Sequence, residues 1–238
     1  MSAVQPNVDI EYPESDGKPM GETDWHIAAI IRLRDMLRLR YRGERVYVGS
    51  DLLVYFVEGE PRRFIVPDVF VVFDCDPKDR RTFKTWEENR VPDVVFEITS
   101  RSTAREDKYF KPRTYEEIGV QEMFLFDPTG EHLVPRLQGF RLSGIELVPM
   151  EKDHEHFHSS ILNVDISAHE TILKLTDSLT GKSVLTGEEF ECQAKEMERQ
   201  AKEMERQAKE MERQARVEAE AKVVQLQAEL DRLRKMQS

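Results

Sequence analysis

Hydrophobic and polar positions alternate in two different ways along this chain. From about residue 45 to residue 166, short apolar runs are separated by charged, glycine-containing or proline-containing stretches, which is typical of β-strands and turns. From Cys192 to Gln237, apolar residues recur every three or four positions and helix formers dominate without an interrupting glycine or proline. The sequence therefore predicts a strand-rich part followed by one long C-terminal helix.

Two helices are expected within the strand-rich part. The first is capped by Asp24, ends near Gly43 and carries one broad apolar stripe; the second runs from Asp107 to Ile118 and is closed by Gly119. Pro112 fits only the first turn of a helix, so the second helix is also compatible with a later start, at Lys111. The stripe of the first helix consists of Ile27, Ile30, Ile31, Leu33, Leu37 and Leu39.

The order of helix, strands, helix and strands predicts an α/β (α+β) fold with a mixed sheet and few helices. The segment from Asp74 to Arg90 is expected to be a charged loop. The expected strands are residues 45–57, 65–73, 93–99, 122–126, 133–137, 139–142, 145–149 and 161–166.

The predicted tail contains three copies of the block Gln-Ala-Lys-Glu-Met-Glu-Arg, from Gln193 to Arg213. Alanine fills one seam position and methionine the other, so the apolar stripe has a period of about 3.5 residues. After Ala215 the next seam residue, Val223, follows at a spacing of eight instead of seven, and Leu226 continues the stripe. This skip predicts a local change of supercoil. This pattern favours a coiled coil and a homodimer, with a lone charged helix as the alternative.

Charge limits the partners of this chain. Its 238 residues carry a formal net charge of −11, and residues 191–238 hold equal numbers of basic and acidic side chains, so the negative charge falls on residues 1–190. Such a balance excludes a general polyanion binder and requires a local basic patch or a bound divalent metal for nucleic-acid contact. Arginines of the first helix are the candidate nucleic-acid contacts, with a solvated helix face as the alternative. They are Arg32, Arg38 and Arg42, accompanied by Arg34 and Arg40.

The chain is expected to divide into an N-terminal arm (1–23), a domain (24–190) and a coiled-coil tail (191–238). The arm is acidic and contains three prolines. The two cysteines of the whole chain, Cys75 and Cys192, lack metal-ligand spacing. No stretch has the pattern of a signal peptide or membrane span. A cytoplasmic protein without membrane contact is therefore expected.

The candidate chemistry lies between Pro67 and Asp127. Asp68 opens an apolar strand, and Glu97 interrupts a run that otherwise predicts a fully buried strand. An ionised carboxylate in such a place requires a partner, and a divalent cation is the simplest one. Alternation also places Asp93 on the same face as Glu97.

Asp107, Lys111 and Tyr115 recur at four-residue spacing and would share one face of the second helix. A surface ion pair is one interpretation. The other directs this face toward Glu97, so that two acids hold Mg²⁺ or Mn²⁺ and one ammonium orients the attacking water. Oxygen ligands without a Cys or His cluster favour these cations over Zn²⁺.

A set of motifs resembles the Uma-two-type restriction endonucleases of the PD-(D/E)xK nuclease superfamily. The set covers nearly all of residues 15–190. Its fragments are Gly17-Lys18-Pro19-Met20, Pro67-Asp68, Glu97-Ile98-Thr99-Ser100, Asp107 with Lys111 and Tyr115, Gly119-Val120 with Glu122, Phe126-Asp127-Pro128, Ser160-Ile161-Leu162, and Thr180-Gly181 with Leu185 and Glu189.

This resemblance implies a restriction-endonuclease-like mixed sheet with flanking helices, and a Mg²⁺-dependent endonuclease that hydrolyses DNA. It implies metal ligands at Asp68 and Glu97, with Lys111 completing the catalytic set. The usual strand lysine is replaced by Thr99, so its role falls to Lys111. The alternative is a catalytically idle nuclease-like domain that acts as an oligomeric interaction protein.

Other polar residues have alternative roles. Glu22 and His26 are candidate accessory ligands or phosphate contacts, and a capping glutamate and a half-buried histidine are the competing interpretations. His154, His156 and His158 alternate as zinc ligands would on a strand, whereas their polar surroundings favour a surface hairpin loop.

Overall fold

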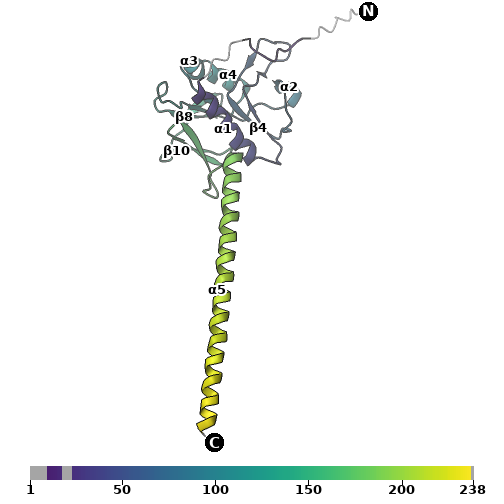
Figure 1. The fold of residues 1–238 in the computed structure, drawn as a ribbon. Coiled ribbons are helices and arrows are strands. Elements are labelled where there is room, and N and C mark those ends of the chain that lie inside the picture. The colour runs from purple at the N-terminus through teal and green to yellow at the C-terminus, as the bar shows by residue number, and fades with distance from the viewer. Residues whose placement is uncertain (1–9, 18–22, 237–238) are drawn as a thin grey trace, which may run out of the picture. The chain divides into compact units, whose positions relative to one another are not determined.

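The computed structural model describes residues 10–17 and 23–236, and it separates into two compact units, Met1–Gly187 and Glu188–Ser238 (Figure 1). A six-stranded mixed sheet forms the centre of the first unit. Its strands, in spatial order, are β1 (Val46–Ser50), β4 (Val69–Phe73), β6 (Val94–Ile98), β7 (Glu122–Phe126), β8 (Leu137–Ser143) and β9 (Glu146–Pro149). β6 and β7 pair in parallel, and the other neighbours are antiparallel. The expected mixed α/β fold is confirmed.

Two three-stranded sheets flank the central one. The first has the order β3-β2-β5 and the second β10-β11-β12. Their strands are β2 (Val54–Tyr55), β3 (Phe64–Ile65), β5 (Phe83–Lys84), β10 (His156–Ser159), β11 (Val164–His169) and β12 (Ile172–Asp177).

Several predicted strand boundaries were wrong for local reasons. The strand expected over residues 45–57 breaks at Asp51, whose φ of 47° does not fit an extended strand. The expected loop at 74–90 contains β5 and a short helix, α2 (Thr85–Glu88). β10 replaces an expected surface loop, and β12 was not predicted.

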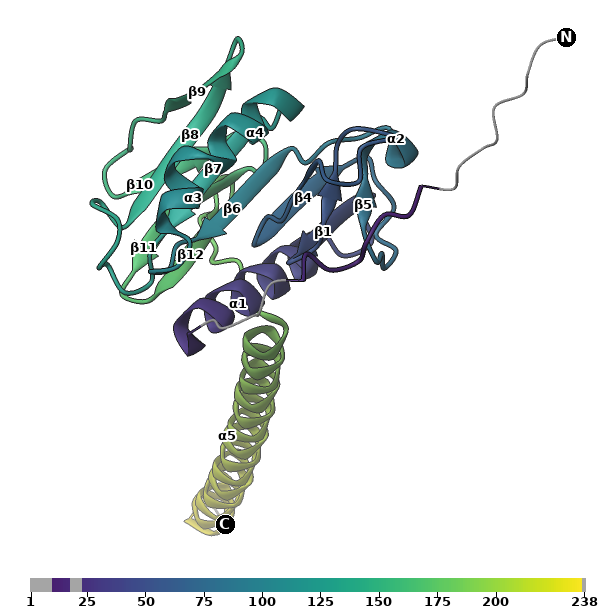
Figure 2. The same cartoon turned by 90° about the horizontal axis from the view of Figure 1, so that it is seen from above.

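The two faces of the central sheet carry different layers, as Figure 2 shows. Helix α1 (Asp24–Arg40) and the sheet β10-β11-β12 share one hydrophobic core with Val69, Val71 and Phe96. The opposite face packs Phe70, Val95 and residues of the sheet β3-β2-β5 with helix α4 (Lys111–Ile118). Alternation along β4 and β6 therefore decides which side chains face α1 and which face α4.

Helix α1 begins where predicted, but its cap and buried face differ from the prediction. Thr23 is the N-cap, and its Oγ1 accepts the N–H of His26 at 3.3 Å, so Asp24 is the first helical residue rather than the cap. Ile27 and Ile31 were expected in the core, yet they are 45% and 59% exposed. The residues that α1 buries are His26, Ala29, Ile30, Leu33, Met36 and Leu37.

The second expected helix is two helices. α3 (Ala104–Tyr109) ends before Phe110, and α4 begins at Lys111 with Pro112 in its first turn. Proline is accepted there because an N–H in the first turn has no helical partner. Gly119 ends α4 with a φ of 83°, as its position predicted.

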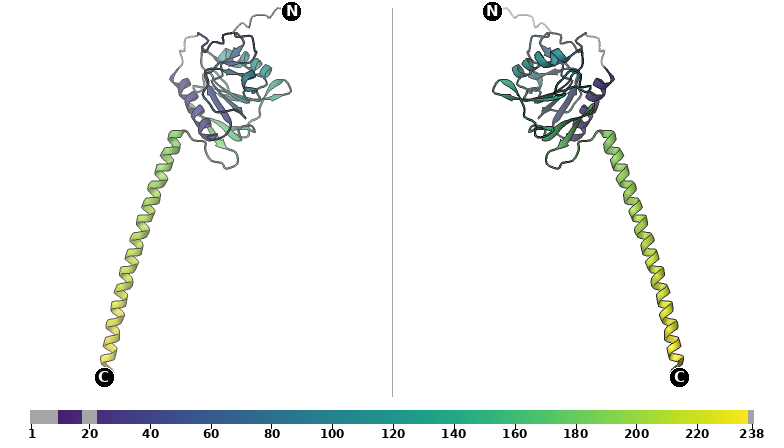
Figure 3. Two further views of the ribbon diagram at one scale, coloured as in Figure 1. Left: turned by 90° about the vertical axis from the view of Figure 1, so that its right-hand side faces the viewer. Right: turned by 90° about the vertical axis from the view of Figure 1, so that its left-hand side faces the viewer.

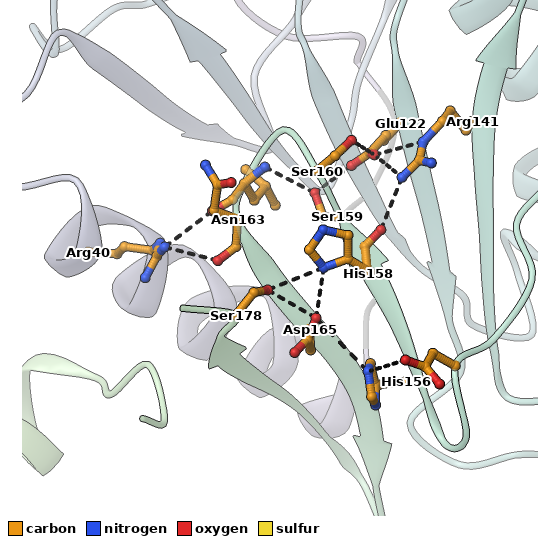
Figure 4. A network of polar contacts seen from close by, with 12 residues as sticks. Arg40, Glu122, Arg141, His156, His158, Ser159, Ser160, Asn163, Asp165 and Ser178 are labelled. Carbon is orange, nitrogen blue, oxygen red and sulfur yellow. Dashed lines mark hydrogen bonds and ion pairs between the residues drawn. The ribbon is translucent and has the colours of Figure 1, made fainter. Parts of the chain in front are cut away.

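A polar cluster joins the sheet β10-β11-β12 to the central sheet (Figure 4). Glu122 is fully buried, and its Oε1 atom accepts hydrogen bonds from Arg141 Nη2 at 2.8 Å and Arg141 Nε at 3.1 Å. The Ser159 hydroxyl also donates to Glu122, and Arg141 Nη2 reaches the carbonyl oxygen of His158 at 3.0 Å. Glu122 therefore has a structural role, since its charge is compensated within this cluster.

Residues 10–17 lie along the small sheet β3-β2-β5. The Tyr12 hydroxyl accepts the N–H of Gly59 at 2.7 Å, and the Tyr55 hydroxyl donates to the Pro13 carbonyl oxygen at 2.6 Å. The rings of Tyr12 and Tyr55 meet edge to face at 5.0 Å. This part of the expected arm is thus fastened to the domain.

The second unit is a single helix, α5, assigned from Gly187 to Met236 (Figures 1 and 3). Charged side chains pair along it, for example Lys202 with Glu198 at 2.6 Å. The methionines of its repeat, Met197, Met204 and Met211, are 64–68% exposed. Among the described residues, no helix combines the length and the apolar character needed to cross a membrane.

Candidate active site

Asp68 and Glu97 lie opposite each other on neighbouring strands. β4 and β6 pair so that Val69 faces Phe96, and extending this antiparallel register by one residue pairs Asp68 with Glu97. Alternation places both acids on the α4 side of the sheet. The Asp68 Oδ2 atom accepts the backbone N–H of Ile98 at 2.5 Å. The two acids expected from the sequence are therefore brought together by strand pairing.

Glu97 is fully buried between polar groups of α4. Its Oε2 atom lies 2.5 Å from Lys111 Nζ, and its Oε1 atom accepts the Tyr115 hydroxyl. Burial raises the pKa of Glu97 well above its usual range, and the Lys111 ammonium only partly opposes this effect. Burial and the adjacent Glu97 also raise the pKa of Tyr115, so its phenol remains a hydrogen-bond donor at neutral pH.

Lys111 is surrounded by carboxylates. Besides Glu97, the Asp107 Oδ1 atom lies 3.1 Å from Lys111 Nζ, across the junction between α3 and α4. Burial alone would lower the pKa of Lys111, but the charges of Glu97, Asp68 and Asp107 raise it well above its usual value. This raised pKa favours the protonated form of Lys111 at neutral pH, in which it donates hydrogen bonds.

Asp107 is the third buried acid of the cluster, and burial raises the pKa of its carboxyl. Asp68, Glu97 and Asp107 outnumber the single ammonium of Lys111. Such an excess of buried carboxylates favours uptake of protons or of a cation.

His26 approaches the cluster from α1. Its Nε2 atom lies 3.5 Å from Asp68 Oδ2, and the side chain is buried. The expectation that His26 belongs near the site agrees with this placement.

A pocket of about 780 Å³ opens onto this cluster. Asp68, Lys111 and His26 line it, whereas Glu97 and Asp107 are fully buried behind these lining residues. The pocket is also lined by Arg34, one of the arginines that the sequence indicated on α1, and by Phe110 of the α3–α4 junction, which the sequence did not identify as a site residue. Ile27 and Ile31 of α1 also line the pocket. The sequence pattern alone could not show this, because their exposure depends on how α1 packs against the sheet.

Other predicted site residues lie elsewhere. Asp93 accepts the N–H of Phe73 at 2.7 Å and Gln121 Nε2 at 3.1 Å, so it ties strands together at the far end of β6. Glu22 lies outside the described residues.

The predicted arginine face of α1 does not act as a unit. Arg38 Nε donates to the Val48 carbonyl oxygen at 3.2 Å, and Arg40 binds Asp177 at 2.8 Å. Arg32 is half-buried and Arg42 is exposed beyond the helix end. Of the five arginines, Arg34 lines the pocket.

The donor set fits a hard divalent cation held by few protein ligands. Asp68 and Glu97 supply carboxylate oxygens, and Mg²⁺ commonly takes one or two carboxylates and completes its shell with water and phosphate. Within the described ranges, no group of three His, Cys, Asp or Glu side chains is arranged to hold a metal. That result includes the histidines of β10, where His158 Nδ1 instead pairs with Asp165 Oδ1 at 2.9 Å.

The family model described as "Putative restriction endonuclease", named Uma2, matches residues 3–168. The chain belongs to the Uma2 family. This is the Uma-two-type family that the motifs resemble, and residues 3–168 include Asp68, Glu97 and Lys111.

A solved structure described as a "putative nuclease belonging to DUF820 from Anabaena variabilis" is similar to this chain. The identity is 15% and the TM-score 0.44, over 61% of this chain and 76% of that chain. A comparison with curated proteins finds no match. Membership of the Uma2 family supports a nuclease.

Proposed function

We propose that this Uma2 protein is a metal-dependent endonuclease that hydrolyses DNA phosphodiester bonds at Asp68, Glu97 and Lys111. One observation carries the proposal: strand register and helix α4 bring two carboxylates and an ammonium together at the end of a pocket. A bound Mg²⁺ or Mn²⁺ would be held by Asp68 and Glu97, and it would supply positive charge that polarises the phosphate and activates water.

Each side chain then has a distinct task. Lys111 stays protonated, so it donates hydrogen bonds to a phosphate oxygen or to the attacking water. Tyr115 fixes the rotamer of Glu97 through its hydroxyl. The N–H of Ile98 fixes Asp68 in the same way. These contacts hold both acids before substrate arrives, which limits the reorganisation needed during the reaction.

Nicking of supercoiled plasmid DNA in Mg²⁺ or Mn²⁺ tests this function. We expect Asp68→Asn and Glu97→Gln to abolish metal-dependent nicking. Asp74→Asn is the matched control, because Asp74 is an exposed acid that pairs with Arg90 at the surface. Equal nicking by wild type and both active-site variants would contradict the proposal.

The idle-domain alternative keeps one specific observation in its favour, since both oxygens of Glu97 are already engaged by Lys111 and Tyr115. Calorimetric titration with Mg²⁺ or Mn²⁺ distinguishes it from the nuclease. Heat that is present in wild type and absent in Glu97→Gln supports the endonuclease, whereas a silent wild-type titration supports the idle domain.

We further propose that helix α5 pairs with a second copy of this chain. The exposed methionines and the alanines of the repeat form one apolar stripe, and the tail carries no net charge that would oppose association. A dimer would present two copies of the proposed catalytic site to a nucleic-acid substrate.

A further inference from the structure

The pocket beside the acids has an apolar wall that the proposed hydrolysis does not by itself require. Ile27 and Ile31 of α1 are among its lining residues although about half of each side chain is exposed. Phe110, at the α3–α4 junction, lines the pocket too and is 57% exposed. Exposed apolar groups gathered in a concavity indicate a ligand with an apolar surface.

Acidic groups outnumber basic ones in this pocket. Its cations are Arg34 and Lys111, and Lys111 Nζ lies 2.5 Å from Glu97 and 3.1 Å from Asp107. The acidic lining residues are Glu14, Asp16, Asp51, Asp68 and Glu106, of which Glu14 pairs with Arg81 at 2.9 Å. A duplex carries about one negative charge per 1.7 Å of its axis, so this lining opposes close approach of intact double-stranded DNA.

Phe110 provides a surface on which a planar group can stack. The Arg105 guanidinium lies 5.9 Å from the centroid of the Phe110 ring, and Arg105 is exposed beside the pocket. Proteins that bind single strands stack bases on exposed aromatic side chains, with cation–π contributions from arginine. The volume of about 780 Å³ lies within the range of pockets that enclose small organic groups.

We infer that this pocket receives an unpaired nucleobase of a single-stranded segment, which stacks on Phe110 while the phosphate next to it reaches the Lys111 ammonium beside Asp68. The inference rests on the proposed nuclease function and specifies its substrate class. Because Asp68 and Lys111 line the pocket, any group bound there lies next to the reactive cluster. A single strand exposes base faces that a duplex hides, and it presents a lower charge density to the acidic lining.

Fluorescence anisotropy with the full chain tests the binding step. The probes are a labelled single-stranded oligonucleotide and the duplex formed with its complement, both measured in Ca²⁺ and at one salt concentration. We expect tighter binding of the single strand. Phe110→Ala should weaken that binding about tenfold, since stacking on an aromatic side chain typically contributes that much or more.

Tyr109 supplies the matched control, because it is an equally exposed aromatic residue next to Phe110 that is not among the lining residues. Tyr109→Ala should leave the Kd within about twofold of wild type, and Phe110→Trp should preserve binding by retaining a stacking surface. Equal effects of Phe110→Ala and Tyr109→Ala, or duplex binding as tight as single-strand binding, would overturn the inference.

Cleavage assays separate this inference from the nuclease proposal. Metal-dependent cutting of intact duplex that depends on Asp68 but not on Phe110 leaves the nuclease standing and rejects the single-strand pocket. Phe110-dependent binding of single strands without cutting in any metal keeps the pocket and rejects the nuclease. Preferential cutting of the single strand, reduced by Phe110→Ala through a higher KM, supports both.

Discussion

The Asp68 carboxylate accepts the backbone N–H of Ile98 at 2.5 Å, so the residue that follows Glu97 in β6 positions the other acid of the pair. Asp68→Asn retains a carbonyl oxygen for this hydrogen bond, whereas Asp68→Ala leaves a buried N–H without its acceptor. We expect both variants to lose cleavage. Asp68→Ala should also lose about 1–3 kcal/mol of unfolding free energy relative to Asp68→Asn, measured by urea denaturation. Equal stability of the two variants would contradict this.

Glu97 should make the stability of the metal-free protein depend on pH. Its pKa is raised in the folded state, so the folded protein holds a proton that the unfolded chain releases. The free energy of unfolding therefore falls as pH rises from the ordinary carboxyl pKa toward the raised pKa of Glu97. Glu97→Gln removes this titration and should flatten the slope.

Bound metal should oppose the loss of unfolding free energy that the metal-free protein shows as pH rises. Mg²⁺ or Mn²⁺ competes with the proton on Glu97, so metal affinity should increase with pH. Thermal denaturation should show a higher Tm for wild type in saturating metal and no shift for Glu97→Gln. An equal metal-induced shift in the variant would place the cation elsewhere.

Lys111→Met should destabilise the domain strongly. Removing the ammonium leaves Glu97 and Asp107 buried without their cation, and breaking such a pair typically costs about 3–5 kcal/mol. The loss should be smaller at low pH, where the acids are protonated. Lys78→Met is the matched control, since Lys78 is exposed and its Nζ atom lies 3.9 Å from Glu88 Oε1. This variant should lower the free energy of unfolding by less than about 1 kcal/mol.

Asp127 organises the turn after β7. Its buried carboxylate accepts backbone N–H groups of Thr129, Gly130, His132 and Leu133. Burial alone would raise the pKa of Asp127, but these donors lower it, so its contribution is present above the ordinary carboxyl pKa and disappears as pH falls through the lowered value. Asp127→Ala should cost about 2–3 kcal/mol at neutral pH in urea denaturation, with a smaller difference near pH 3.

The apolar stripe of α5 should control self-association. Replacing Met197, Met204 and Met211 together by Gln preserves helix propensity while removing apolar area from the stripe. We expect sedimentation velocity to show a shift from dimer to monomer. Arg199, Arg206 and Arg213 changed to Gln form the control, because they lie outside the stripe and should leave the dimer intact. Dimers in both triple variants would contradict the proposed pairing.

The core of the candidate site was accessible from the sequence because each residue breaks a local pattern. Glu97 is a charge inside an apolar strand, and Pro112 allowed a helix start at Lys111 although one helix from Asp107 was expected. Such conflicts between residue type and local structure have few physical solutions. The expected sheet faces followed from alternation, and the pairing of Asp68 with Glu97 needed only the register of β4 and β6.

The pocket could not be predicted in the same way. Ile27 and Ile31 lie at helical spacing with Ile30, and a stripe of this kind normally packs in a core. Their exposure depends on which strands α1 covers, which is decided by contacts far apart in the sequence. The same holds for Arg40, whose partner Asp177 lies on a strand that the sequence pattern did not indicate.

The fastening of Tyr12 and Pro13 to the small sheet matters for how the protein is produced. The residues that follow them, Glu14, Ser15 and Asp16, line the pocket. Clipping by a contaminating protease after Tyr12 would therefore remove an anchor of residues that border the pocket while leaving Asp68 and Glu97 in place. A loss of the proposed activity in such a preparation would report on the border of the pocket and not on the two acids.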